Sequence, residues 1–177
     1  MKVLVSNEEI IEICKDIGSK LSEKFKDKFP VVICVLKGAA PFHAELIKHM
    51  NIDLEVDYIQ VKSYVGKETS GSVTFKKDLD VNIEGRDVII VEDIVDSGIT
   101  LNALTNAIDE RNPSSITFVT LLDKPSRRKV EAKPDYVGKT IENLFVFGFG
   151  LDLNEKCRNL KDIYYFDEPF TLEDKIQ

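Results

Sequence analysis

The 177-residue chain has few cysteines, few histidines and no long apolar run. The three cysteines (Cys14, Cys34, Cys157) are odd in number and widely spaced, so core packing is expected rather than disulfides or metal binding. The two histidines, His43 and His49, are off the shared helix face that a zinc pair needs. Both are expected at the surface or partly packed, with no role. No apolar run approaches the roughly 18 residues of a membrane span, so no membrane partner is expected.

The charge balance restricts the partners that the chain can have. The formal net charge is −7 and the isoelectric point is near 5.0. A nucleic-acid backbone is therefore disfavoured as a partner, because it needs clustered positive charge. A small anionic substrate remains compatible, since a few local cations and backbone amides can hold it. The start Met1–Ser6 is short and soon acidic, unlike a secretion signal, so a cytoplasmic location is expected.

Alternating apolar strands and amphipathic helices predict one α/β domain over residues 1–177, with a central, mainly parallel sheet flanked by helices. Ser6 and Glu9 form a capping box that opens the first helix. Ligands of such sheets bind outside the carboxyl ends of the strands, where three polar breaks are predicted. Strands are expected near residues 31–36, 54–61, 73–75, 88–91, 115–122, 136–137, 145–149 and 163–166, and helices near 7–26, 40–50 and from 99 onward.

The stretch 88–101 is the most informative part of the chain. It reads as a buried strand, a short acidic turn, a small-residue loop and the start of a helix. The first N–H groups of a helix lack partners and carry partial positive charge, so the backbone around Ser97, Gly98 and Thr100 suits a phosphate. Gly98 lets the backbone approach a ligand without an intervening Cβ atom.

Carboxylates lie directly before this phosphate cradle. Glu92 and Asp93 can accept hydrogen bonds from sugar hydroxyls or hold a divalent metal such as Mg²⁺. The combination predicts a ribose phosphate as ligand. The alternative is a strand-end turn in which Asp96 or Ser97 only caps the helix.

Five segments, in order along the chain, resemble the motifs of the type I phosphoribosyltransferases, and more narrowly of the hypoxanthine (hypoxanthine-guanine) phosphoribosyltransferases. The resemblance covers nearly the whole chain and implies a mobile active-site loop over about 63–73. It also implies a small hood over about 140–177 with N-terminal contributions. The segments are 36–39, 63–71, 91–100, 122–124 and 145–158.

The resemblance implies transfer of the 5-phosphoribosyl group from phosphoribosyl pyrophosphate to a 6-oxopurine, with Mg²⁺ as cofactor. Asp96 would act near purine N7 as a general base or hydrogen-bond acceptor. A cis peptide is expected between Leu36 and Lys37. The other implied contacts are Glu92 and Asp93 for the ribose hydroxyls, Ser97, Gly98, Ile99 and Thr100 for the 5′-phosphate, Lys37, Gly38 and Arg158 for pyrophosphate, Lys124, Phe145, Val146 and Asp152 around the purine, Glu92, Asp93 and Asp152 for the metal, and Ser63 and Tyr64 at the head of the mobile loop.

Two positions in this scheme need comment. Ile99 stands where many relatives carry lysine or a polar residue, which leaves the phosphate cradle without a side-chain cation. Arg128 is expected to add positive charge near the pyrophosphate.

Three interpretations remain open from the residues. The leading one is a 6-oxopurine phosphoribosyltransferase that forms IMP and GMP. The first alternative is an enzyme of the same fold specific for xanthine or a pyrimidine. The second is a regulator that senses phosphoribosyl pyrophosphate or nucleotide while binding RNA or DNA, which the acidic balance disfavours. The resemblance also implies a homodimer or homotetramer.

Overall fold

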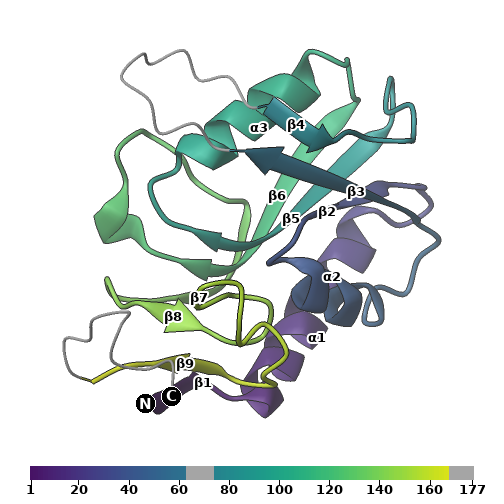
Figure 1. Cartoon of the computed structure of the whole chain (residues 1–177). Helices are drawn as coiled ribbons and strands as arrows, with labels where there is room; N and C mark the ends of the chain where they lie inside the picture. Colours follow the sequence, from purple (N-terminus) through teal and green to yellow (C-terminus); the bar gives the residue numbers. More distant parts are fainter. Residues whose placement is uncertain (63–73, 168–177) are drawn as a thin grey trace.

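The fold is that of a computed structural model, which describes residues 1–62 and 74–167 (Figure 1). Two sheets and three α-helices make up this part of the chain. The helices are α1 (Asn7–Lys24), α2 (Ala40–Ile47) and α3 (Ile99–Asp109), with a 3₁₀ turn over Pro125–Arg127. The strands are β1 (Lys2–Val5), β2 (Val31–Val35), β3 (Glu55–Lys62), β4 (Thr74–Lys77), β5 (Asp87–Val95), β6 (Ser115–Asp123), β7 (Tyr136–Thr140), β8 (Val146–Phe147) and β9 (Ile163–Tyr165).

The main sheet has the strand order β4-β3-β2-β5-β6-β7. Every neighbouring pair in it is parallel except β3 and β4, which are antiparallel. The α/β class with a mainly parallel central sheet is therefore confirmed. Within the described ranges no helix is both long and apolar enough to cross a bilayer.

The two faces of the main sheet pack against different helices. Val32 of β2 belongs to the cluster that contains the buried residues of α1 and α2, whereas its neighbour Ile33 belongs to the cluster around α3. Ile89 and Ile90 of β5 divide in the same way. Since both faces of the strands are buried, β2 is apolar throughout, as expected of a central parallel strand. Each such side chain contributes about 1.5–3 kcal/mol through burial.

A second, smaller sheet has the antiparallel order β1-β9-β8. In Figure 1 it lies below the carboxyl ends of β5 and β6. The strand β1 was not expected from the sequence, because a four-residue strand is a weak local signal and its partner is far away in the chain. Asp162 ties this sheet to α1, since its Oδ1 accepts a hydrogen bond of 2.8 Å from the backbone N–H of Asn7.

The structure confirms one of two local predictions in part and contradicts the other. The capping box at α1 is confirmed on one side, because Ser6 Oγ accepts from the Glu9 N–H at 3.2 Å. The predicted acidic turn after Val91 is wrong. Strand β5 continues through both acids, and Val95 still pairs with Asp123 of β6. The ladder of hydrogen bonds to β6 outweighs the local charge pattern there.

The surface position expected for the histidines is wrong for His43. Its side chain is buried, with its ring edge-on to Tyr58 at a centroid distance of 5.7 Å. Burial lowers the pKa of His43, so the ring is held neutral. Cys14 and Cys34 are free and buried, which confirms that they pack in the core.

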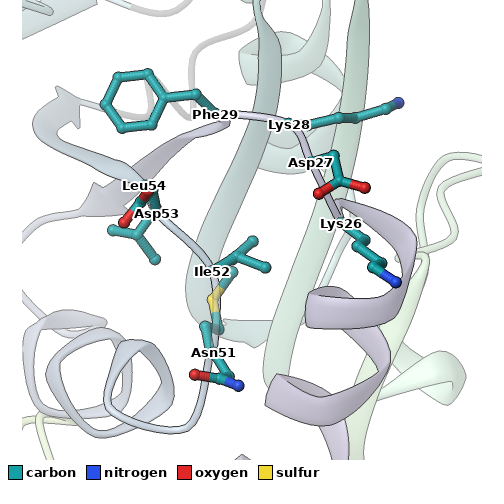
Figure 2. A pocket seen from close by; sticks show the side chains of 9 residues that line it. Lys26, Asp27, Lys28, Phe29, Asn51, Ile52, Asp53 and Leu54 are labelled. Atoms are coloured by element: carbon teal, nitrogen blue, oxygen red, sulfur yellow. The ribbon is translucent and has the colours of Figure 1, made fainter.

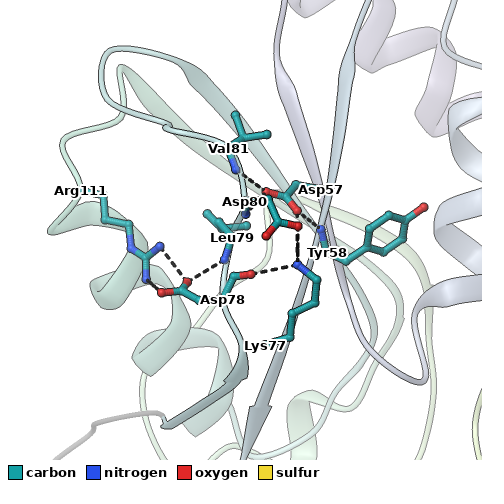
Figure 3. Close-up of polar contacts among 8 residues, drawn as sticks. All are labelled: Asp57, Tyr58, Lys77, Asp78, Leu79, Asp80, Val81 and Arg111. Atoms are coloured by element: carbon teal, nitrogen blue, oxygen red, sulfur yellow. Dashed lines mark hydrogen bonds and ion pairs between the residues drawn. The ribbon is translucent and has the colours of Figure 1, made fainter.

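A buried carboxylate fixes the turn between β4 and β5 (Figure 3). Asp57 of β3 is 3% exposed, and its Oδ2 accepts from the backbone N–H groups of Asp80 and Val81 at 2.8 and 2.9 Å. Next to it, Asp78 forms an ion pair with Arg111, just after α3, at 2.8 Å. These contacts hold the return strand to both its sheet neighbour and a helix end.

Candidate active site

The loop between β5 and α3 surrounds a small cavity of about 90 Å³. Gly98 stands at the N-cap position of α3 with φ of 82°. Neither Asp96 nor Ser97 is therefore the N-cap residue, although Ser97 Oγ accepts a long hydrogen bond of 3.4 Å from the Ile99 N–H. A Cβ atom on Gly98 would lie 2.7 Å from the Cβ of Ala132, so both conformation and space favour glycine. The cavity is lined by Glu92, Ile94, Val95, Asp96, Ser97, Gly98, Thr100, Leu101 and Phe118.

The acid pair lies at the carboxyl end of β5, and its ionisation is disfavoured. Burial raises the pKa of Glu92 well above its ordinary value, and the neighbouring charge of Asp93 raises it further. Burial also raises the pKa of Asp93. Two adjacent, half-buried carboxylates at a strand end need hydrogen-bond donors or a cation, which a ribose or a metal can supply.

The loop after β2 lies directly against this pair. A Cβ atom placed on Gly38 would come within 1.7 Å of Asp93 Oδ2, so only glycine leaves room for the carboxylate. The peptide between Leu36 and Lys37 is cis, as expected. A Cβ atom on Gly150 would lie 2.0 Å from the carbonyl oxygen of Gly38. The loops that follow β2 and β8 therefore converge on the acid pair near the end of β5.

Lys37 and Arg158, the cations expected to bind pyrophosphate, and Asp152, an expected metal ligand, lie close to these loops. Arg158 donates to the Gly150 carbonyl oxygen at 2.8 Å and pairs with Asp152 at 2.9 Å. Lys37 pairs with Glu155 at 2.8 Å, and Glu155 is 3.3 Å from Arg158. Glu155 was not anticipated. The only sequence signal is its place between Asp152 and Arg158, two residues that the resemblance singles out.

Asp96 lies between two cations. Arg127 Nε donates to Asp96 Oδ1 at 3.0 Å, and Lys124 Nζ lies 3.9 Å from Asp96 Oδ2. The Lys124 side chain is 8% exposed, and burial lowers its pKa. The structure thus joins Asp96 and Lys124, two predicted site residues. Arg127 is a neighbour that sequence reasoning missed, although it belongs to the basic segment after β6.

Arg128 binds the segments at the end of β5 and after β6. Its guanidinium donates to the backbone carbonyl oxygens of Val95, Asp96 and Ala132 and pairs with Asp123. These contacts tie the segment after β6 to the end of β5. Arg128 thus supports the loop after β5, and its expected charge near the pyrophosphate stays a prediction.

The remaining candidates lie elsewhere. Phe145 and Val146 belong to the edge of the small sheet, where the Phe145 side chain is exposed and Val146 pairs with Tyr165. Ser63 and Tyr64, predicted to head a mobile loop, lie outside the described residues.

A larger groove, of about 870 Å³, lies at the amino ends of the main-sheet strands, opposite the candidate site (Figure 2). The segments that line it, 26–29 and 50–54, precede the amino ends of β2 and β3. In Figure 2 Phe29 and Lys26 lie at opposite ends of the groove. It contains none of the predicted site residues.

Comparison with known proteins identifies the family. A model of the phosphoribosyl transferase domain matches residues 2–154. The chain is 51% identical over 161 residues to the hypoxanthine-guanine phosphoribosyltransferase of Bacillus subtilis, covering 90% of this chain and 89% of the relative. The chain belongs to the hypoxanthine-guanine phosphoribosyltransferases.

Solved structures agree with this assignment. A hypoxanthine phosphoribosyltransferase from Staphylococcus aureus superposes with a TM-score of 0.90 at 42% identity, covering 94% of this chain and 91% of the other. A hypoxanthine-guanine phosphoribosyltransferase from Bacillus anthracis gives a TM-score of 0.90 at 43% identity, covering 94% and 98%. The prediction of an enzyme is confirmed.

Proposed function

We propose that this phosphoribosyltransferase serves purine salvage: it transfers the 5-phosphoribosyl group from phosphoribosyl pyrophosphate to hypoxanthine and guanine, forming IMP or GMP and releasing pyrophosphate. The observation that carries the proposal is the close approach of three segments at the carboxyl ends of the strands: Gly38 lies against Asp93, and Gly150 lies against Gly38. Arg158 donates to the Gly150 carbonyl oxygen, Lys37 directly precedes Gly38, and Glu92 borders the cavity at the Gly98 loop.

In this proposal the donor spans the three loops. Its 5′-phosphate occupies the cavity beside Ser97, Gly98, Ile99 and Thr100, where main-chain N–H groups bind it and no cation from position 99 is needed. The ribose hydroxyls donate to Glu92 or Asp93. This contact favours the ionised carboxylates that burial disfavours in the free protein. Lys37 and Arg158 bind the departing pyrophosphate.

Asp96 and Lys124 handle the purine. During transfer the bond from ribose C1′ to the pyrophosphate oxygen breaks, a bond from C1′ to a purine nitrogen forms, and the N7 proton passes to Asp96. Arg127 orients that carboxylate before the base enters. The buried ammonium group of Lys124 donates to purine O6, which selects 6-oxopurines over adenine.

Mg²⁺ fits the donor set at this edge. The described residues hold no group of three or more metal-ligating side chains, but Mg²⁺ is usually bound by one or two carboxylates together with waters and substrate phosphates. Glu92 and Asp93 would hold the ion as such a pair, and Asp152, which pairs with Arg158 at 2.9 Å, is the further oxygen donor proposed for it. The ion would neutralise charge on the donor's hydroxyl and pyrophosphate oxygens.

The small sheet is proposed as the hood over the base, with Phe145 stacking on the purine and the Val146 backbone at its edge. The chain is further proposed to act as a homodimer or homotetramer in the cytoplasm.

A base panel tests the function. The protein is mixed with phosphoribosyl pyrophosphate, Mg²⁺ and one base at a time, and nucleotide formation is followed by absorbance. Hypoxanthine and guanine should be converted, and adenine and pyrimidines should not. Preferential use of xanthine or a pyrimidine would overturn the proposed specificity. Omission of Mg²⁺ should abolish turnover.

A further inference from the structure

Glu155 lies at the tip of a tight hairpin in an unfavourable backbone conformation. Leu153 and Lys156 exchange two backbone hydrogen bonds of 3.0 Å, so the turn between them has two residues. Both turn residues are left-handed, with φ of 52° at Asn154 and 62° at Glu155. Such turns favour Asn followed by Gly. Asn154 fits this preference, whereas Glu155 occupies the position that glycine suits best.

The Glu155 side chain accounts for its presence there. Its two carboxylate oxygens contact different cations: Oε2 lies 2.8 Å from Lys37 Nζ, and Oε1 lies 3.3 Å from Arg158. Lys37 comes from the loop after β2, 118 residues earlier in the chain. The carboxylate therefore joins the two cations that the proposed function assigns to pyrophosphate. Strained backbone that places a side chain in this way is typical of functional positions.

Arg158 also retains one unused hydrogen-bond donor. The buried Nε of Arg158 has no hydrogen-bond partner among the described residues, although the other guanidinium nitrogens are bonded. The Glu155 side chain is 66% exposed and the Lys37 side chain 57%, so their contact can open without disturbing the core.

We propose that Glu155 is an internal counter-anion of the pyrophosphate site: it holds Lys37 and Arg158 in the substrate-free enzyme and is displaced when a pyrophosphate group binds. This inference rests on the proposed function, which places pyrophosphate between these cations. Because the leaving group must displace a carboxylate, its affinity is lower than the two cations alone would give. Glu155 thus weakens retention of the product pyrophosphate after transfer.

The test is calorimetric titration of inorganic pyrophosphate with Mg²⁺ into the wild-type protein and Glu155→Gln. Exposed ion pairs are weak, so pyrophosphate should bind the variant about two- to tenfold more tightly. The affinity for IMP, which does not occupy the pyrophosphate site, should not change. Glu142→Gln, at another exposed glutamate, is the matched control and should bind pyrophosphate as the wild type does.

A second variant separates the charge from the backbone. Glu155→Gly removes the carboxylate and also relieves the left-handed conformation, so it should bind pyrophosphate as tightly as Glu155→Gln and melt no lower than the wild type. Unchanged or weaker pyrophosphate binding in both variants would overturn the inference and leave the proposed function standing. Failure of the wild type itself to bind pyrophosphate would overturn both.

Discussion

The amino ends and the carboxyl ends of the main-sheet strands, called the amino edge and the carboxyl edge, carry hollows of very different size and chemistry. The groove at the amino edge has a volume of about 870 Å³, whereas the cavity at the carboxyl edge has about 90 Å³. Yet the small cavity borders Glu92, whose pKa is strongly raised, and the phosphate loop at Gly98. The amino-edge groove has lysines and aspartates whose charges face solvent. Convergent loops and perturbed ionisation, rather than volume, are therefore the reasons for choosing the carboxyl ends of the strands as the candidate site.

Of the substitutions that compare the two edges, replacement of Asp96 should reduce activity the most. Asp96→Asn keeps the side-chain shape but cannot accept a proton, so kcat should fall by about 100- to 10,000-fold. The matched control is Asp53→Asn in the amino-edge groove, which should leave kcat unchanged. Steady-state kinetics with hypoxanthine measures both. An undiminished kcat in Asp96→Asn would remove the general-base role.

A methyl group on Gly38 tests the contact between loops. In Gly38→Ala the new Cβ would overlap Asp93 Oδ2, so the acid must shift. We expect a loss of about 100-fold in kcat/KM, since displacements near 1 Å can cost that much, and a loss of about 1–3 kcal/mol in stability.

Gly85→Ala is the control for this substitution. A Cβ at Gly85 meets nothing within 4 Å, but φ is +69°, so only backbone strain is introduced. It should cost about 1–2 kcal/mol in stability and leave kcat/KM intact. Equal kinetics in the two alanine variants would refute the steric argument.

Replacing Glu92 by glutamine should make the protein more stable and its enzyme activity weaker. A raised pKa means that the folded protein prefers protonated Glu92, so the stability from this group is present at low pH and is lost as pH rises through its folded-state pKa. Glu92→Gln mimics the protonated form. The substrate-free variant should therefore be about 1 kcal/mol more stable than wild type at neutral pH.

This gain has a definite pH dependence. It should vanish at acid pH, where wild-type Glu92 is protonated in both states, and grow as pH rises. Denaturant unfolding at several pH values measures it, while KM for phosphoribosyl pyrophosphate should rise. A variant less stable than wild type at neutral pH would contradict the assigned cause.

The smallest effect is expected at the amino edge. The Phe29 ring is 53% exposed and lies 5.0 Å from the Arg86 guanidinium. Phe29→Ala should cost about 0.5–1 kcal/mol in unfolding free energy and leave kcat/KM unchanged. A tenfold loss of kcat/KM would instead place a ligand in the larger groove.

Most of the fold could be predicted because its signals are local. The apolar run at 31–36 and the capping box at Ser6 each specify an element from neighbouring residues alone. The misses depend on distant partners. Strand β1 exists because β9 pairs with it, and β5 extends past Val91 because β6 continues alongside.

The candidate site shows the same division. Residues that follow strand ends, such as Lys37 and Asp96, could be placed at one sheet edge from topology alone. Arg127 and Glu155 could not, because their partners are set by how loops fold back over the site. The need for glycine at Gly38 likewise emerges only when Asp93 is seen beside it.

The pairing of Lys2 with Tyr165 bears on the order of assembly during synthesis. All strands of the main sheet have been synthesised once the nascent chain reaches Thr140, whereas β9, the partner of β1, is synthesised later. The small sheet can therefore form only after the strands of the main sheet have been synthesised, and until then β1 exposes an unpaired edge that favours aggregation. A chain stalled before Ile163 would carry the phosphate loop without the small sheet that lies below it.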